Sequence, residues 1–338
     1  YWPDSHEAVV SSFMIGKCHL LNGEPSKADK VFAQLAEDFP KHSLATLSRV
    51  EMLGIASARK DKDRQVELWT DIAYKTPKTK ETASYRSSAA RSLATHFFQE
   101  NEFQKAVEAL DTYYDKNRPD HLHAVHDVCN SVVSRLFRSP ETKSRAEKLG
   151  DGLKSFDEQA LPNDSQEKKD KDRTRDLLER ITSVHKSLDR DKQVLASYER
   201  MGKVLGMDDE ILGSMASWHK EKKRVDQARS IYGRYKDQVN GRRAVARSYR
   251  DERNYEEAVR QYLSLIAMDK DREAEWQRDV VETWRGAYKV LRQAKYLTKA
   301  IATYQILLKV DPDRFSEYNW GIAECHEKLS KWKEAILS

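Results

Sequence analysis

The chain has 338 residues, of which 34% are charged and 39% hydrophobic, and it contains only 12 Gly and 8 Pro. So few chain breakers argue against an all-β protein and suit long solvated helices, while the supply of apolar side chains argues against general disorder. The formal net charge of +5 is too small to indicate a nucleic-acid partner by itself, and no apolar run approaches the roughly 18 residues of a membrane span.

A three-residue signature recurs along the chain and predicts paired helices. In its first copy, Ala28 is followed by Phe32 and then by Leu35, a spacing that places all three on one helix face. A separate helical stripe precedes it at residues 15–19, and the turn signal "NGEPS" lies between the two. The later copies are Gln65, Trp69 and Ile72; Ala106, Leu110 and Tyr113; a weaker one centred on Ala146 and Leu153; Val194, Tyr198 and Met201; Ala228, Tyr232 and Tyr235; Ala258, Tyr262 and Leu265; Ala300, Tyr304 and Leu307; and a start at Ala335.

The copies begin 30 to 48 residues apart and each follows its own helical stripe, so one unit corresponds to two helices. This pattern resembles the tetratricopeptide repeat, in which a small residue of the first helix faces Ala and an aromatic of the second. The resemblance implies an all-α fold: a right-handed α-solenoid of about eight to nine antiparallel helix pairs, with no sheet. Small residues occupy the expected places at Gly16, Ala94, Ala216, Ala246 and Ala323, and Pro40, Pro77 and Pro312 stand at unit ends.

One segment interrupts the repeat. Residues 161–176, "LPNDSQEKKDKDRTRD", are polar and charged with a Pro near the start, which favours an insertion within a continuous solenoid over a flexible hinge. We therefore predict N-terminal repeats over 1–160, a charged insertion or linker over 161–176, and C-terminal repeats over 177–338. The unit just before the insertion is degenerate, with Gly150 where an aromatic is expected.

A cluster of histidines raises the question of a metal site. His121, His123 and His126 lie close to Asp120 and Asp127, but His121 faces away from the other two on a helix and no HExxH motif completes the set. A polar helix start capped by Asp120 is the preferred interpretation, and we predict no metal site.

No GxSxG, Walker, GxGxxG or local Cys/His signature occurs, so we predict that the chain is not an enzyme and uses no cofactor.

Three further histidines and the three cysteines lie on apolar helical stripes. Packing predicts partly or fully buried side chains for His19, His219 and His326 and free buried thiols for Cys18, Cys129 and Cys325.

Two neighbouring repeats carry matching basic stripes. Residues 284–299, "WRGAYKVLRQAKYLTK", hold five basic residues and no acidic one, and three of the basic residues follow an apolar stripe one position later, about 100° around the helix. The same three positions are basic 42 residues earlier. The resemblance places such residues on a concave groove built from first helices. We therefore predict a partner-binding surface made of Arg243, Arg247, Arg250, Arg285, Lys289 and Arg292, with Lys220 and Lys186 as extensions.

Clustered cations on adjacent helices attract carboxylates or phosphates. We expect a non-catalytic protein-interaction scaffold that binds an acidic peptide or protein segment and suits a larger assembly. The alternative function, a nucleic-acid-binding repeat protein, is disfavoured because the aromatics that would stack on bases mostly occupy packing positions. These aromatics are Tyr249, Tyr262, Tyr288 and Tyr304. The alternative for the stripe is an ordinary solvated surface paired with acids on second helices, such as Glu256 and Glu257.

The first unit also resembles repeats of bacterial envelope proteins, such as the outer-membrane assembly lipoprotein and the coordinator of the Tol-Pal system. The stretch concerned is "ADKVFAQLAEDFPKHSLATLSRVEMLGIA", and it favours the bacterial envelope or periplasm over the cytoplasm. Because the chain begins at Tyr1 and ends within the helical pattern "KWKEAILS", we expect it to be part of a longer protein.

Overall fold

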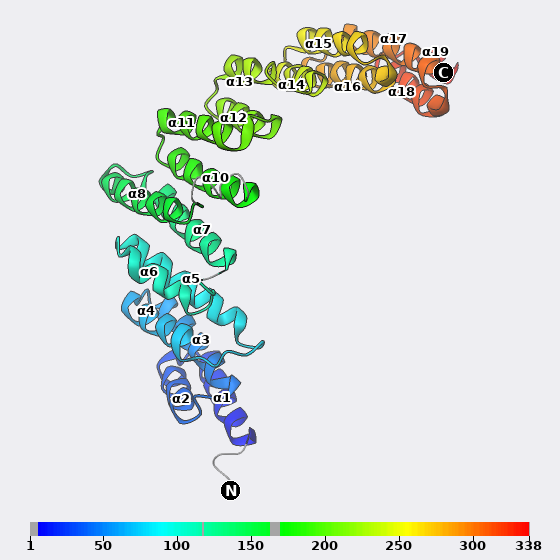
Figure 1. Cartoon of the computed structure of the whole chain (residues 1–338). Helices are drawn as coiled ribbons and strands as arrows, with labels where there is room; N and C mark the ends of the chain where they lie inside the picture. Colours follow the sequence, from blue (N-terminus) through cyan, green and yellow to red (C-terminus); the bar gives the residue numbers. More distant parts are fainter. Residues whose placement is uncertain (1–5, 117, 163–169, 338) are drawn as a thin grey trace. The chain divides into compact units, whose positions relative to one another are not determined.

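The computed structural model describes residues 6–116, 118–162 and 170–337, and Figure 1 labels its helices. Over these residues the chain is helical between short turns and contains no strand, as the repeat signature predicted. Contacts group it into two compact units, residues 1–197 (the N-terminal unit) and 198–338 (the C-terminal unit). None of the described helices is long and apolar enough to cross a membrane.

The N-terminal unit is a series of helix pairs. Its helices are α1 (His6–Leu21), α2 (Pro25–Asp38), α3 (Ser43–Ala58), α4 (Lys62–Thr70), α5 (Ala83–Gln99), α6 (Phe103–Asp111), α7 (Pro119–Leu136), α8 (Lys143–Gln159) and α10 (Lys171–Ser187), followed by α11 (Asp191–Met201), which contains the division between the units. Consecutive helices from α1 to α10 pack on one another, and first helices of neighbouring pairs also touch, as α5 and α7 and then α7 and α10 do.

The C-terminal unit continues in the same manner. Its helices are α12 (Asp209–Glu221), α13 (Val225–Tyr232), α14 (Gln238–Asp251), α15 (Tyr255–Met268), α16 (Glu273–Leu291), α17 (Ala294–Val310), α18 (Phe315–Lys328) and α19 (Trp332–Leu337). The described residues thus form nine helix pairs, in agreement with the eight to nine predicted.

The turns inside the pairs share one backbone device. After the first helix, the 6→1 hydrogen bond of a Schellman motif closes most turns, for example from Glu24 N to His19 O at 2.8 Å. The residue before the donor has a positive φ, and only the first such turn uses glycine. Glycine content therefore could not locate these turns from sequence. Positive φ occurs in this role at Gly23, Lys60, Asn101, Asp189, Lys223, Arg253 and Ser330, whereas Arg292, also with a positive φ, ends α16 through the single bond from its own N to Tyr288 O.

Small residues of first helices lie against the aromatics of the signature. A Cβ on Gly16 would come within 2.4 Å of the Phe32 ring, and one on Gly321 within 2.4 Å of the Tyr304 ring. Both rings are buried, and burying a side chain of this size contributes roughly 1.5–3 kcal/mol. The predicted small-against-aromatic contact thus exists, although in the last pair Gly321 makes it and Ala323 is only half-buried.

In the degenerate unit, side chains of the next helix pair fill the space beside Gly150 of α8. A Cβ on Gly150 would lie 2.7 Å from Leu188 Cδ1, and Val184 packs beside it. Leu188 and Val184 are both buried at the end of α10. The missing aromatic of α8 is therefore replaced by aliphatic side chains that reach in from α10.

The predicted insertion at 161–176 is only partly visible. Residues 163–169 lie outside the described residues, whereas residues 171–176 form the first turns of α10. Asp170 is its N-cap and accepts a hydrogen bond from Arg173 N at 3.3 Å. The division of the chain around this segment stays a prediction.

Two local predictions were wrong. Cys18 is exposed, because it lies two positions after buried Gly16 and therefore about 200° around α1. The N-cap of α7 is Arg118, with Pro119 at the first helical position, so Asp120 lies inside the first turn and caps nothing. The predictions for the other cysteines and for the three stripe histidines are confirmed: Cys129, Cys325 and His219 are buried, and His19 and His326 are half-buried.

Candidate functional site

The basic stripes lie on α14 and α16, the first helices of two consecutive pairs. α16 uses its apolar side to bury Trp276, Trp284 and Ala287, and α14 buries Ala246 and Ser248. The apolar sides of both helices are therefore buried by packing, and the basic residues lie beside these buried sides, as the stripe spacing predicted.

On α14, Arg243 pairs with two acids of the next first helix. Its Nη1 lies 2.7 Å from Glu275 Oε1 on α16. Its Nη2 lies 3.0 Å from Asp279 Oδ2, an ion-pair contact without hydrogen-bond geometry. The guanidinium also lies over the Trp276 ring, 5.1 Å from its centroid. Arg243 thus links α14 to α16, and these two acids already compensate its charge.

Arg285 repeats this arrangement one pair later. Its Nη2 lies 2.6 Å from Glu324 Oε2 on α18, and its Nη1 donates to the Tyr304 hydroxyl at 3.0 Å. The ammonium of Lys328, by donating a hydrogen bond to Glu324, and then the charge of Arg285 hold the pKa of the Glu324 carboxyl below its ordinary value. Glu324 therefore stays ionised and gathers two cations at one place.

The acids that pair with the stripe are not those that the sequence suggested. Glu256 binds Lys299 Nζ at 2.7 Å, and Glu257 contacts Arg260 on its own helix. Partners come instead from the following first helix. The same pattern occurs between Lys17 and Glu51 at 2.9 Å and between Lys220 and Asp251 at 2.8 Å. The predicted extension Lys220 is thus already paired, and Lys186 lies on α10 in the N-terminal unit.

A cavity of about 540 Å³, the basic cavity, lies between α16 and α18. It holds four basic and two acidic side chains, an excess of two positive charges. Lys289 and Arg292 are exposed there, and neither has an ion pair within the described part of the chain. The lining consists of Glu282, Arg285, Gly286, Tyr288, Lys289, Arg292, Leu297, Glu324 and Lys328.

The structure brings together only half of the predicted surface. Arg285, Lys289 and Arg292 share the basic cavity, whereas Arg247 and Arg250 on α14 are not in its lining. These two lie close to Tyr262: burial raises the pKa of its hydroxyl, and the charges of Arg250 and Arg247 partly offset that rise.

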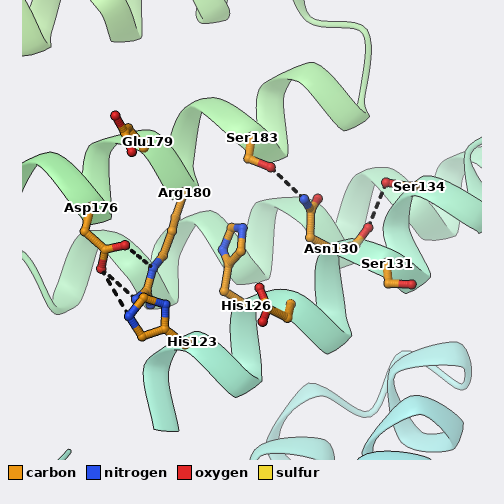
Figure 2. Close-up of a pocket in the computed structure, with 10 residues that line it drawn as sticks. His123, His126, Asn130, Ser131, Ser134, Asp176, Glu179, Arg180 and Ser183 are labelled. Atoms are coloured by element: carbon orange, nitrogen blue, oxygen red, sulfur yellow. Dashed lines mark hydrogen bonds and ion pairs between the residues drawn. The ribbon is translucent and has the colours of Figure 1, made fainter. Parts of the chain in front are cut away.

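A second cavity, of about 440 Å³, lies between α7 and α10 in the N-terminal unit, and we call it the polar groove (Figure 2). Its lining is His123, His126, Asp127, Asn130, Ser131, Ser134, Asp176, Glu179, Arg180 and Ser183. Two of the clustered histidines line it, while His121 turns away and lies 2.6 Å from Asp111. Sequence reasoning missed the α10 side of the groove, because those residues begin in the segment taken for a linker.

Two family models, each of the tetratricopeptide repeat, match the chain, one over residues 11–42 and the other over residues 243–274. The chain carries tetratricopeptide repeats. The first match spans most of α1 and α2, and the second begins at Arg243 of the basic stripe and runs through α15. Tetratricopeptide repeats serve protein–protein interaction, which makes this chain a repeat protein of the interaction class.

Several solved structures resemble the chain at low identity. They include the P58(IPK) TPR domain, 14% identical over 97% of this chain and 81% of that chain, with a TM-score of 0.24. Yeast Tom70 is 12% identical over 98% and 90%, with a TM-score of 0.25. A Podosopora anserina putative kinesin light chain with TPR-like repeats is 12% identical over 60% and 97%, with a TM-score of 0.26. At such scores the likeness carries no further argument, and no curated protein matches the sequence.

Proposed function

We propose that the basic cavity binds an acidic peptide or protein segment and that the chain is a non-catalytic scaffold in a larger assembly. The observation that carries this proposal is the pair Lys289 and Arg292, exposed in a concave lining and without an ion pair among the residues described. Carboxylates of a bound segment would form charge-assisted hydrogen bonds with both. Arg285, held by Glu324, would act mainly as part of the wall.

The aromatic side chains favour a protein segment over nucleic acid. Base stacking needs an exposed aromatic face. Tyr262 and Tyr304 are buried, and the Arg229 guanidinium covers Tyr249 at 3.8 Å from the ring centroid. Arg292 lies over the ring of Tyr288 at 5.9 Å. Of the four aromatics named from sequence, two are therefore buried, and an arginine already lies over one face of each of the other two.

The proposal is tested with fluorescein-labelled acetyl-hexaglutamate amide and the full chain, by fluorescence anisotropy. Lys289→Glu/Arg292→Glu should weaken binding by about tenfold or more, since two charge-assisted contacts become repulsive. The matched control is Lys270→Glu/Lys331→Glu, which makes the same charge change at two exposed lysines outside the cavity. Far-UV circular dichroism checks that both variants stay folded.

Three outcomes would contradict the proposal. If the cavity variant binds the peptide as tightly as the unmodified chain does, the basic cavity is not the binding site. Equal losses in the cavity variant and the control show that only net charge matters. Tighter binding of a single-stranded oligonucleotide of equal charge, falling steeply with salt, favours the nucleic-acid alternative.

A further inference from the structure

One glycine in the interior of α16 has no packing reason within the described chain. Glycine inside a helix is less stable than alanine, so it usually marks a close contact. Gly16 and Gly321 are such cases, since a Cβ on either would come within 2.4 Å of an aromatic ring. At Gly286, apart from the adjacent residues and the helix backbone itself, no atom of the described chain lies within 4 Å of the position of a Cβ. Its φ is not positive either, so the backbone does not require glycine.

Gly286 is half-buried and lines the basic cavity. Gly54 of α3 is the other α-helical glycine with such open space, but it is exposed and lines neither of the two cavities described above. Open space beside a half-buried residue belongs to a concavity and not to a convex surface. The bare backbone of α16 at Gly286 therefore forms part of the floor of the basic cavity.

The charges on the two sides of Gly286 differ. On the same side of α16, Glu282 lies one turn earlier and Lys289 one turn later, and Arg292 follows at the end of the helix. An acidic group of a ligand is attracted to Lys289 and Arg292 and repelled by Glu282. The acids of a bound segment therefore belong at the Lys289 end, and an uncharged part of the segment lies over Gly286.

The lining favours main-chain atoms over an apolar side chain at the floor. Six of the nine lining residues are charged, so an apolar side chain finds little to pack against. A peptide main chain carries N–H donors, and the Glu282 carboxylate can accept them. The absence of a Cβ on Gly286 lets such a main chain come into contact with the helix.

We infer that the bound segment lies with its main chain against Gly286 and its acidic side chains between Lys289 and Arg292. This inference rests on the proposed function and adds the composition of the segment, in which acidic residues adjoin small uncharged ones such as glycine, alanine or serine. Gly286 is a specificity-determining residue, because any side chain at this position fills the space that the main chain of the segment takes.

The test uses the full chain and fluorescein-labelled Gly-Gly-Glu-Glu-Gly-Gly amide, measured by fluorescence anisotropy. Small residues flank the acids of this peptide on both sides, so the direction of binding is not presupposed. Gly286→Ala should weaken binding about threefold and Gly286→Leu about tenfold or more, because the added side chain takes the place of the main chain. The urea midpoint of both variants should be equal to or higher than that of the unmodified chain, since alanine and leucine are better helix formers.

The matched control makes the same two changes at the other open glycine, as Gly54→Ala and Gly54→Leu. Gly54 has the same open space inside a helix, but it lies in the N-terminal unit and outside the basic cavity. Both control variants should keep or raise the urea midpoint and bind the peptide as the unmodified chain does.

Three results would overturn the inference and leave the proposed function standing, provided that Lys289→Glu/Arg292→Glu still loses affinity. The first is a Gly286→Leu variant that binds the peptide as tightly as the unmodified chain. The second is an equal loss of affinity in the Gly54 variants. The third is a lower urea midpoint for Gly286→Ala, which shows that the glycine serves packing. If Lys289→Glu/Arg292→Glu itself binds as tightly as the unmodified chain, the proposed function and this inference are both wrong.

Discussion

The basic cavity and the polar groove lie at equivalent places in the repeat, each between the first helices of consecutive pairs, yet they carry opposite charge. The basic cavity has an excess of two positive charges, and the polar groove an excess of two negative ones. The repeat therefore decides where a groove forms. The residues beside the packing stripe decide what it can bind.

The two sites also differ in how their walls are held. The polar groove rests on the pair His126–Asp157, whose side chains are 7% and 0% exposed. The basic cavity rests on Arg285–Glu324, whose side chains are 32% and 31% exposed. Water screens the Arg285–Glu324 pair but not the buried His126–Asp157 pair. Breaking the buried pair therefore has the larger effect on stability.

The largest expected effect is that of His126→Ala. It leaves the Asp157 carboxylate buried without its partner, which should lower the free energy of unfolding by about 3–5 kcal/mol. Arg285→Ala, which breaks the half-exposed pair, should cost about 1 kcal/mol for the ion pair plus some lost packing. Urea unfolding followed by circular dichroism measures both. A similar loss of unfolding free energy in the two variants would show that the two ion pairs stabilise the protein to the same extent.

A double variant separates charge from packing. His126→Leu/Asp157→Leu replaces the buried pair by apolar side chains of similar size, and its stability should return close to that of the unmodified chain. If the double variant is as unstable as His126→Ala, the loss comes from packing and not from the unpaired carboxylate.

A smaller difference is expected at two close-packed glycines. Gly→Ala within a helix gains about 1 kcal/mol from helix propensity, whereas overpacking costs about 1–3 kcal/mol. At Gly321 the new methyl meets the Tyr304 ring at 2.4 Å, and a ring cannot move aside without shifting its helix. At Gly150 it meets a Leu188 methyl at 2.7 Å, which can rotate away. Gly321→Ala should therefore destabilise the protein, and Gly150→Ala should be close to neutral by urea unfolding.

The smallest expected effect concerns pH. Burial first, and then the charges of Arg190 and Lys154, lower the pKa of the His185 imidazole in α10 below its ordinary value of 6.5. The unfolded chain therefore takes up a proton near pH 6.5 while the folded chain does so only at lower pH, so this stabilising contribution is present above pH 6.5 and lost as pH falls below it. The urea midpoint should drop between pH 7.5 and 5.5.

The matched variant is His185→Gln, whose urea midpoint should fall less over the same interval. In the C-terminal unit, Glu275 and Glu324 have lowered pKa values, so their contributions are lost only below the ordinary glutamate value of 4.5. An equal drop for His185→Gln and the unmodified chain would show that His185 does not cause the acid sensitivity of the N-terminal unit.

Much of the fold followed from local spacing. The signature of Ala28, Phe32 and Leu35 and its copies located the second helices, and the stripes before them located the first helices. The turns were harder to locate, because most of them use a non-glycine residue with positive φ. The start of α10 was missed because its charged first turns look like a linker until Leu177 and Leu178 become buried.

The candidate sites were less predictable. Sequence spacing placed Lys289 and Arg292 on one side of a helix, and the structure places both in the basic cavity. It could not show that Arg243 and Arg285 are already paired, since their acids are 32 to 39 residues away on the next first helix. The acidic partner and the envelope location remain predictions.

The sequence by itself determined the helix pairs and the sides on which they pack, because burial on a helix follows a local period that residues within two turns reveal. The tertiary structure decided which charges are left for a partner. It joined His126 to Asp157 across 31 residues and set α10 against α7, and such pairings depend on distances through space that no local spacing encodes.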